Sequence, residues 1–151
     1  MPDIEITPFD ISLYDDVLAL WQQCDGVGLS DADSRDGIQK YLARNPGMSF
    51  VASSSGKIMG AILAGHDGRR GYIHHLAVHP EFRKKGVARR LVDCSIEQLK
   101  NSGIRKCHLF VFNNNHAGLS FWQKIGWRRR LELSIVSRQT AEHESQNPAP
   151  Q

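Results

Sequence analysis

The sequence predicts a mixed α/β domain with a central sheet and helices on both of its faces. Segments that alternate with the two-residue period of strands are interspersed with amphipathic helical segments. In the second half the two kinds alternate regularly, which favours parallel pairing of the strands there. The 151 residues, 40% of them hydrophobic and 23% charged, fit one domain with a substantial core.

The first half is predicted to contain one strand, two helices and a hairpin. IEITPF alternates as a short strand, and LYDDVLALWQQC follows with helical spacing and Asp10 or Ser12 as its cap. A weaker helix, SRDGIQKYLARN, ends before Pro46. MSFVAS and KIMGAILAGH are strand-like, and the turn SSSG between them indicates a hairpin.

The second half is predicted to contain three strands and two helices. YIHHLAV is a strand stopped by Pro80, and residues 85–102 carry the apolar stripe of a helix with Gly103 just past its end. KCHLFVF is a strand, and HAGLSFWQKI is a helix with Asn115 as its N-cap and Gly126 as its C-cap. RRLELSIVS alternates as a last strand.

Several classes of protein are excluded by composition. Residues 139–151 have almost no apolar side chains and are interpreted as a disordered polar tail, so the domain is placed at residues 1–138. No apolar run could span a bilayer and MPDIEITPFD lacks the features of a signal peptide, which indicates a cytoplasmic protein without a membrane partner. Three scattered cysteines fit neither a disulfide framework nor a zinc site, and no metal is expected. A net charge of +3 does not by itself indicate a nucleic-acid partner.

The stretch HPEFRKKGVARRL places three consecutive cations and a glycine at the start of a helix. The unpaired N–H groups and the dipole of a helix start bind anions. Gly86 lets the backbone approach such an anion, and Ala88 keeps the next turn small. The surrounding cations are Arg83, Lys84, Lys85, Arg89 and Arg90. Since GxxxxGK[ST] and GxGxxG are absent, the stretch is interpreted as a phosphate site of another kind.

The spacing Arg83-x-x-Gly86-x-Ala88, after a strand that ends in LAVHP, resembles the pyrophosphate-binding motif of the GNAT superfamily of acyl-CoA-dependent N-acetyltransferases. NNNHAGLSFWQKIGW resembles the second motif of that family, and the order of elements matches over nearly the whole chain. LALWQQCD further resembles a bacterial subgroup, the YpeA-type acetyltransferases, which are related to ribosomal-protein-alanine acetyltransferases. The resemblance implies a three-layer fold with a splayed cofactor cleft, and acetyl-CoA as the cosubstrate.

The resemblance also implies how the cosubstrate is held. A bulge would splay the strand that ends at Val78, so that its edge pairs with the pantetheine amides, and N–H groups near Leu76 and Ala77 would polarise the thioester carbonyl. The cofactor-binding residues implied in this way are Leu76, Ala77, Val78, Arg83, Lys84, Lys85, Gly86, Val87, Ala88, Arg89, Asn115 and Trp122.

The candidate catalytic bases are His74 and His75, on the strand that leads to Leu76. Histidine titrates in the range needed to accept a proton from an amine. Neighbouring side chains on a regular strand point to opposite faces, so only one of the two is expected to face the acceptor. His74 is slightly favoured, although a bulge would exchange the two.

The resemblance fails at two catalytic positions. Trp122 stands where many members of the family carry a tyrosine acid, and its indole can donate a hydrogen bond but not a proton at neutral pH. Phe110 replaces the glutamate base of ribosomal-protein-alanine acetyltransferases. Water, Tyr72 or Cys107 would then have to protonate the leaving thiolate.

The expected function is transfer of an acetyl group from acetyl-CoA to a primary amine, by direct attack within a ternary complex. A small-molecule amine and a peptide or protein amine remain alternatives for the acceptor. The alternative from another class is a non-catalytic acyl-CoA-binding sensor or regulatory module, in which Trp122 and Phe110 mark lost chemistry. A homodimer that completes the sheet or the cleft is a further expectation.

Overall fold

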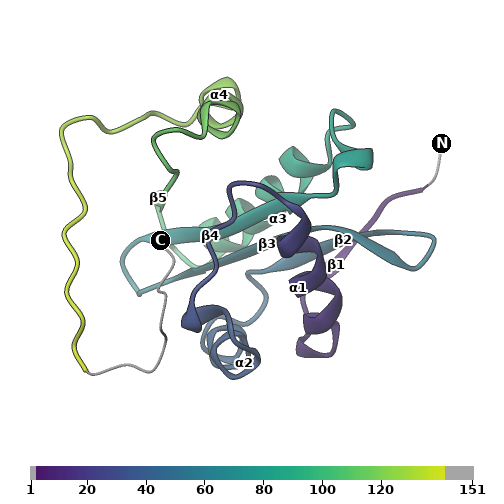
Figure 1. The fold of residues 1–151 in the computed structure, drawn as a ribbon. Coiled ribbons are helices and arrows are strands. Elements are labelled where there is room, and N and C mark those ends of the chain that lie inside the picture. The colour runs from purple at the N-terminus through teal and green to yellow at the C-terminus, as the bar shows by residue number, and fades with distance from the viewer. Residues whose placement is uncertain (1–2, 142–151) are drawn as a thin grey trace.

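A five-stranded mixed sheet in the order β1-β2-β3-β4-β5 forms the centre of the computed structural model, which describes residues 3–141 (Figure 1). The strands are β1 (Glu5–Pro8), β2 (Phe50–Ser54), β3 (Lys57–His66), β4 (Gly71–Val78) and β5 (Cys107–Leu109). The helices are α1 (Tyr14–Gln23), α2 (Arg35–Arg44), α3 (Val87–Asn101) and α4 (His116–Lys124), with short 3-10 turns η1 (Ile11–Leu13), η2 (Asp31–Asp33) and η3 (Pro80–Phe82). Neighbouring strands are antiparallel except β4 and β5, which are parallel. The predicted α/β class and the parallel pairing in the second half are confirmed.

Strand β3 shows that the sheet is covered on both faces. Ala61 and Leu63 belong to a buried cluster with α1 and α2, whereas Met59, Ile62 and Ala64 belong to a second cluster with α3. A strand buried on both faces is a nearly continuous apolar run, as KIMGAILAGH is. The three-layer arrangement therefore follows from the composition of this strand. None of the helices in residues 3–141 is long and apolar enough to cross a membrane.

A β-bulge in β4 opens the sheet. Leu63 pairs with His75, but the next residue of β3, Ala64, pairs with Ile73, so His74 is the extra residue. Strand β5 pairs with β4 only over Gly71–Ile73. Beyond the bulge, no strand of the described residues pairs with the β5 side of β4. The predicted splay is thus present, and the bulge lies in the strand in which it was expected.

The helix boundaries follow the expected caps. The Asp10 carboxylate, not Ser12, caps the N-terminal segment, because it accepts a hydrogen bond from the Ser12 N–H at 2.9 Å. The Asn115 side chain caps α4 by accepting from the Gly118 N–H at 2.9 Å. Gly103, with φ of +82°, ends α3.

Two strand predictions require correction. KCHLFVF forms a strand only over Cys107–Leu109, since β4 diverges from it after the bulge. RRLELSIVS, predicted as the last strand, is not a strand in the structure, because no strand of the described residues pairs with it. Figure 1 shows it as an extended segment at the side of the molecule. The polar tail expected from residue 139 lies outside the described residues apart from residues 139–141.

Candidate active site

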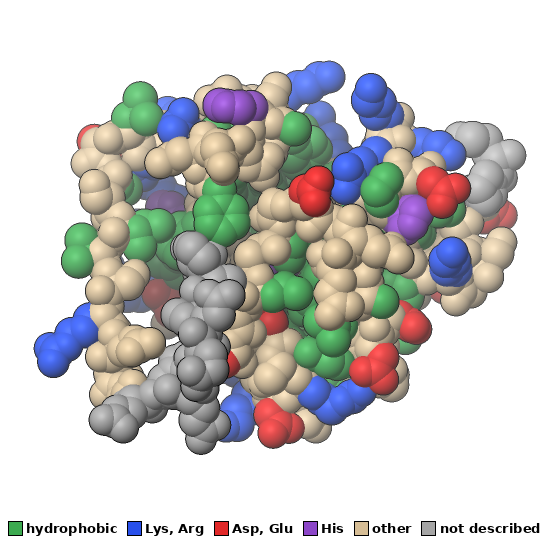
Figure 2. All heavy atoms as spheres, in the orientation of Figure 1, with side chains coloured by type: hydrophobic (Ala, Val, Ile, Leu, Met, Phe, Trp, Pro, Cys, Tyr) green, Lys and Arg blue, Asp and Glu red, His purple; other side chains and the backbone are tan. Residues whose placement is uncertain are grey.

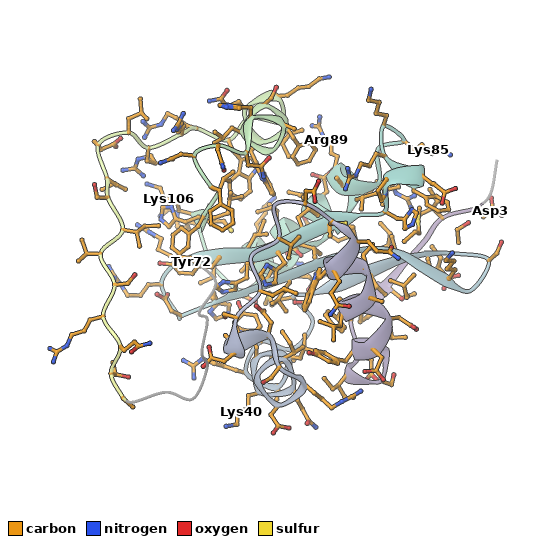
Figure 3. The ribbon with its side chains drawn as sticks, viewed as in Figure 1. Asp3, Lys40, Tyr72, Lys85, Arg89 and Lys106 are labelled. Atoms are coloured by element: carbon orange, nitrogen blue, oxygen red, sulfur yellow. The ribbon has the colours of Figure 1, made fainter. Side chains whose placement is uncertain are left out.

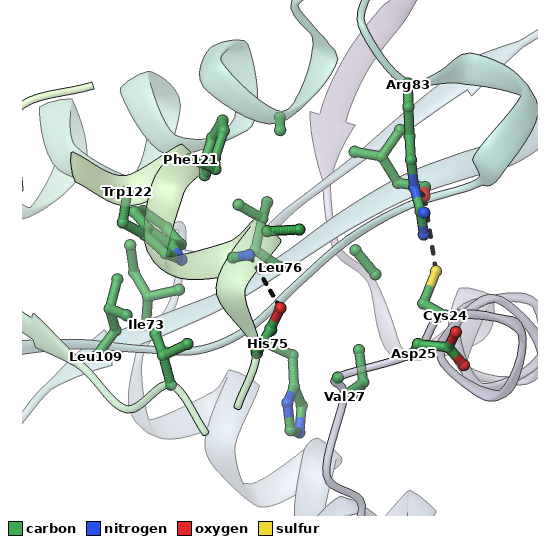
Figure 4. Close-up of a pocket in the computed structure, with 18 of the residues that line it drawn as sticks. Cys24, Asp25, Val27, Ile73, His75, Leu76, Arg83, Leu109, Phe121 and Trp122 are labelled. Carbon is green, nitrogen blue, oxygen red and sulfur yellow. Dashed lines mark hydrogen bonds between the residues drawn. The ribbon is translucent and has the colours of Figure 1, made fainter. Parts of the chain in front are cut away.

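A cleft of about 600 Å³ lies between the splayed part of β4, the segment after β5, the N-terminal ends of α3 and α4, and the loop that follows α1. In Figure 4, Arg83 and Cys24 lie on one side of the cleft, Phe121 and Trp122 on the other, and Leu76 between them. The structure brings all the expected cofactor-binding residues except Lys85 to the lining of this cleft. Among these expected residues, Leu76 and Trp122 are 46 positions apart in the sequence, yet both line the same cleft.

The turn before α3 has the geometry of an anion site. Lys84 and Gly86 adopt left-handed backbone conformations, with φ of +63° and +81°. The Arg90 N–H donates to the Gly86 carbonyl at 3.1 Å, so the amides of residues 87–89 precede the hydrogen-bond ladder of the helix. Those amides and the positive end of the helix dipole lie at the cleft.

The basic residues of this stretch divide into two groups. Arg83, Lys84 and Arg89 line the cleft. The Lys85 ammonium instead lies over the Phe82 ring, 5.5 Å from its centroid, and does not line the cleft. The expectation that Lys85 contacts the cofactor is therefore not supported by this arrangement. In Figure 3, Lys85 and Arg89 lie on the same side of the molecule, and Lys40 of α2 lies on the opposite side.

Arg83 also fixes the end of β4. Its Nε donates to the Val78 carbonyl at 2.9 Å, and the Cys24 thiol donates to the same oxygen at 3.6 Å (Figure 4). The end of the splayed strand is thereby tied to both the cationic turn and the loop after α1. The sequence pattern indicated the charge of Arg83 but not this structural contact.

The register of β4 decides which amides face the cleft. The His79 N–H donates to the Met59 carbonyl at 2.8 Å across the antiparallel pair. Since hydrogen-bonded and non-hydrogen-bonded pairs alternate, the amide of Ala77 faces β3, whereas those of Leu76 and Val78 face away from it. Leu76 and Val78 are thus the residues whose amides are available on the cleft side. The expectation that Ala77 supplies an N–H to the thioester is corrected by this register.

The bulge changes the expectation for the histidine pair. The His75 ring lies 4.9 Å from Trp21 of α1, and the His74 ring lies 5.1 Å from Tyr41 of α2 and 6.3 Å from Tyr72. Both imidazoles therefore contact the α1/α2 layer, and both residues line the cleft. The expectation that only one faces this side is wrong, because the extra residue interrupts the alternation of the strand.

Asp33 is a site residue that the sequence did not reveal. Its Oδ1 lies 2.8 Å from the His75 Nε2, and each residue is only 6% exposed. Its Oδ2 accepts from the Ser30 N–H at 3.0 Å, and its main-chain oxygen accepts from the Tyr14 hydroxyl at 2.6 Å. Ser30 and Asp33 form a capping box, which is readable as a local turn. Nothing in the sequence connects that turn to a histidine 42 positions away.

His74 has a different environment from His75. Although His74 is an exposed residue, the rings of Tyr41 and Tyr72 flank its imidazole and partly desolvate it. This desolvation, assisted by His75 and opposed by the Asp33 carboxylate, lowers the pKa of His74. The neutral, proton-accepting form of His74 is thus favoured near neutral pH.

Acidification is expected to destabilise the fold in part through His74. The unfolded chain takes up this proton near the ordinary pKa of 6.5, before the folded chain does. The free energy of unfolding is therefore highest above the ordinary pKa of histidine, and it falls as the pH drops from there toward the lowered pKa of the folded chain. Urea unfolding at pH 7 and pH 5 should show a smaller loss of stability in His74→Gln than in the unmodified chain. His116→Gln, which removes an exposed imidazole from α4, should keep the full loss; equal losses in both variants would contradict this assignment.

Trp122 packs at the wall of the cleft. Its ring lies 5.1 Å from Phe121 and 4.9 Å from Trp127, and it belongs to the partly buried residues around the α3 cluster. The structure thus brings Trp122 to the cleft, where its indole can donate a hydrogen bond but cannot supply a proton.

The proposed substitutes for the missing acid lie outside the cleft lining. Phe110 itself, which replaces the glutamate base of the related enzymes, does line the cleft and is 53% exposed. Tyr72 contacts Phe110 and His108 but does not line the cleft. Cys107 lines a different groove, and burial raises the pKa of its thiol to about 12. Neither Tyr72 nor Cys107 is placed to protonate a thiolate in the cleft.

Asn115 connects two walls of the cleft. Besides capping α4, its side chain lies so close to Gly26 that a Cβ built on Gly26 would stand 2.8 Å from the Asn115 Nδ2. The loop after α1 therefore meets the start of α4 across one end of the cleft. The Asn115 side chain thus caps α4, as the sequence predicted, and also lines the cleft.

The fold and the cleft together define a protein that presents helix-start amides, cations and an open strand edge to one long cavity. Backbone amides, guanidinium and ammonium groups and imidazoles supply its chemistry. Within residues 3–141, no group of three or more His, Cys, Asp or Glu side chains is placed to hold a metal ion.

Comparisons with known proteins agree with this description. A model of the acetyltransferase (GNAT) family matches residues 14–127. An acetyltransferase of Photorhabdus laumondii is 32% identical over 133 residues, which are 88% of this chain and 92% of that protein. The PaiA N-acetyltransferase from Thermoplasma acidophilum, solved in complex with coenzyme A, has a TM-score of 0.73 at 19% identity, covering 83% of this chain and 90% of its own. The ribosomal-protein-S18-alanine N-acetyltransferase from Escherichia coli has a TM-score of 0.68 at 17% identity, covering 82% and 77%.

The chain belongs to the acetyltransferase (GNAT) family. The expected enzyme class, an acyl-CoA-dependent N-acetyltransferase, and the expected cosubstrate, acetyl-CoA, are confirmed by this membership. The three-layer α/β fold with a splayed sheet is confirmed by the solved structures.

Proposed function

We propose that the protein transfers the acetyl group of acetyl-CoA directly to a primary amine while both substrates are bound. The observation that carries this proposal is the position of Leu76 in the cleft, between the anion-binding turn before α3 and the buried His75–Asp33 pair. One cavity thereby joins a place for the cosubstrate phosphates to a place for proton removal. Direct attack requires the cosubstrate and the amine to occupy these two places at the same time.

The residues of the cleft fit a bound acetyl-CoA. The amides of residues 87–89 and the side chains of Arg83, Lys84 and Arg89 would hold the diphosphate. The backbone edge at Leu76 and Val78 would pair with the pantetheine amides as an added strand would. The cosubstrate supplies the activated acetyl group as a thioester.

The Leu76 amide is the proposed donor to the thioester oxygen. It faces the cleft by the register of β4, and the bulge beside it leaves that edge without a strand partner among the described residues. A fixed N–H that stabilises developing negative charge typically contributes about 3 kcal/mol to such a reaction. Trp122, on the opposite wall, would donate a hydrogen bond there but leave protonation of the thiolate to water.

His75 is the proposed base. The carboxylate of Asp33 can only accept, so the Nε2 of His75 carries the hydrogen and the Nδ1 keeps the lone pair that takes a proton. Neutralising a lysine-type amine of pKa about 10.4 at pH 7 costs about 4 to 5 kcal/mol, and an α-amine near pKa 8 costs only about 1 to 1.5. His75 is therefore most needed for the more basic acceptor. His74, between the rings of Tyr41 and Tyr72, would border the bound amine.

The acceptor is proposed to approach from the loop after α1 as a cation. Asp25 and the loop residues up to Gly28 line the cleft beside the histidine pair (Figure 4). An exposed carboxylate at the entrance attracts a protonated amine before the amine loses its proton. A small-molecule amine and a peptide amine both meet this requirement.

Steady-state kinetics with a panel of amines test the proposed reaction. Thiol release from acetyl-CoA should be saturable in at least one of a polyamine, an amino acid, an aminoglycoside or a peptide with a free N-terminus. Initial rates over both substrate concentrations should give intersecting double-reciprocal lines, because both substrates must be bound together. Parallel lines with a trapped acetyl-enzyme would refute direct attack, and binding of acetyl-CoA without thiol release from any amine would refute transfer to amines.

A further inference from the structure

A row of aromatic rings continues the surface of the cleft along β4 and β5. The centroid of the Tyr72 ring lies 6.3 Å from that of His74, at an interplanar angle of 20°, and 6.4 Å from that of Phe110. His74 and Phe110 both line the cleft, so Tyr72, which does not line it, extends the same surface outward. The Tyr72 ring also lies 5.8 Å from the His108 ring of β5. These four rings form an aromatic platform (Tyr72, His74, His108 and Phe110).

The aromatic platform lies on the face of the sheet that carries α1 and α2. The His74 ring contacts Tyr41 of α2, 5.1 Å away. Cys107 and Leu109 alternate with the two platform residues of their segment, and both belong to the partly buried residues around the α3 cluster on the opposite face. Phe110 is 53% exposed and His74 is exposed, so the platform is accessible to a ligand. A ligand ring would pack here in the stacked or edge-on arrangements that aromatic pairs prefer.

Two basic residues border the aromatic platform where β4 and β5 begin. Arg70 precedes Gly71, whose N–H donates to the Lys106 carbonyl at 2.9 Å, so Arg70 and Lys106 lie beside each other at the start of the parallel pair. Extended by one residue, the two-residue period of the strands places Arg70 on the face of Tyr72, and Lys106 on the face of His108. In Figure 3, Tyr72 and Lys106 lie on the same side of the molecule, and Figure 2 shows hydrophobic, histidine and basic side chains together at the left of the view.

The charges of Arg70 and Lys106 have no carboxylate partner within residues 3–141. The described salt bridges include neither residue, whereas the Arg130 Nε lies 2.8 Å from the Glu132 Oε2. Burial and then neighbouring positive charges lower the pKa of His108. The contributing cations are Arg130, Lys106 and Arg70. An anionic group at this end of the aromatic platform would therefore meet two positive charges that are not already neutralised.

We infer that the acceptor is a monoamine that carries an aromatic ring and, at the end remote from its amine, an anionic group. This inference rests on the proposed acetyl transfer. The amine would lie at His75, the ring on Tyr72 and Phe110, and the anionic group at Arg70 and Lys106. At the usual rise per residue of a strand, Tyr72 lies about 10 Å along β4 from His75. A molecule that reaches both positions is about as long as an extended tripeptide.

Polycationic amines are disfavoured by the same two charges. A polyamine or an aminoglycoside would place a second ammonium group near Arg70 and Lys106, where like charges repel it. A carboxylate or phosphate at that position is attracted instead. The inferred acceptor therefore differs in charge from these other amines, although all of them present a primary amine to the base.

Three tripeptides with the same N-terminal amine test the inference on the full chain. The first has two alanines and a C-terminal phenylalanine, the second ends in leucine and lacks the ring, and the third is the C-terminal amide of the first and lacks the charge. Titration calorimetry with the protein saturated with coenzyme A should show binding of the first about tenfold tighter than of either other peptide. The advantage of the carboxylate over the amide should shrink as the salt concentration is raised. Rates of acetyl transfer to the three peptides should follow the same order.

Variants locate the ring and the anionic group separately. Tyr72→Leu and Phe110→Leu should each remove most of the preference for phenylalanine over leucine, and Tyr72→Phe, which keeps the ring, should retain it. Phe110 is 53% exposed, so its replacement does not disturb the core. Arg70→Gln should remove most of the preference for the carboxylate over the amide. Arg69→Gln, which removes a positive charge from the neighbouring exposed residue, is the matched control and should retain that preference.

Binding and acetyl transfer fail in distinguishable ways. Equal binding of the three tripeptides, binding of none of them, or the same loss in Arg69→Gln as in Arg70→Gln would overturn the inference, whatever other amines are acetylated. Preferential binding of the phenylalanine peptide without thiol release from acetyl-CoA would support the aromatic platform as a binding surface and refute the proposed transfer to this amine.

Discussion

Replacing Gly86 by alanine is expected to weaken acetyl-CoA binding at least about tenfold. Gly86 has a φ of +81°, where a Cβ costs roughly 1 to 2 kcal/mol, and each 1.4 kcal/mol is a factor of ten in affinity. Relief of that strain would rotate the amides of residues 87–89, which face the proposed diphosphate site. The added methyl would meet no protein atom within 4 Å, so it would stand in space that is open to the ligand.

Gly103→Ala is the matched control for this prediction. Gly103 has a φ of +82° at the other end of the same helix, and a Cβ there would also meet nothing within 4 Å. Both variants should lose similar thermal stability, and only Gly86→Ala should lose affinity in titration calorimetry with acetyl-CoA. Equal affinities in the two variants would mean that the turn before α3 does not hold the diphosphate.

The features that the sequence predicted are those that depend on neighbouring residues. The cap at Asn115, the glycine at 103 and the cationic turn at Gly86 each need only a few adjacent side chains and a backbone angle. The family motif then placed these local features around a common cleft, and eleven of the twelve expected cofactor residues line that cleft. Lys85 does not line the cleft, because its ammonium lies over the nearby Phe82 ring, a direction that the sequence alone does not reveal.

The features that the sequence did not predict depend on pairing between distant segments. The alternation of RRLELSIVS is that of a strand, but a strand also requires pairing with a partner, and no strand of the described residues pairs with this segment. The side to which His74 points was set by a bulge, whose exact position depends on the register of β4 against β3. Asp33 reached His75 only through the folding of η2 onto the sheet.

His75→Gln is expected to lower kcat about 100- to 1,000-fold with a lysine-type amine, within the usual contribution of a positioned base. The loss should be much smaller with an α-amine, because less free energy is needed to neutralise that acceptor. Acetyl-CoA affinity should not change, since the His75 side chain faces the α1/α2 layer and the phosphate turn lies before α3. His74→Gln is the control on the same strand; a larger loss in that variant would transfer the role of base to His74.

Asp33→Asn separates the function of this pair from its contribution to packing. Asparagine has the same shape, but its amide can donate to the His75 Nε2, which would move the ring hydrogen to Nδ1 and remove the lone pair that accepts the proton. We therefore expect a fall in kcat similar to that of His75→Gln, with a thermal midpoint and acetyl-CoA affinity that change little by comparison. Activity with the lysine-type amine should recover as the pH approaches the pKa of the free amine, because the acceptor then needs no base. A uniform loss at every pH, equal for lysine-type and α-amines, would assign the His75–Asp33 pair a structural role, since packing does not depend on the basicity of the acceptor.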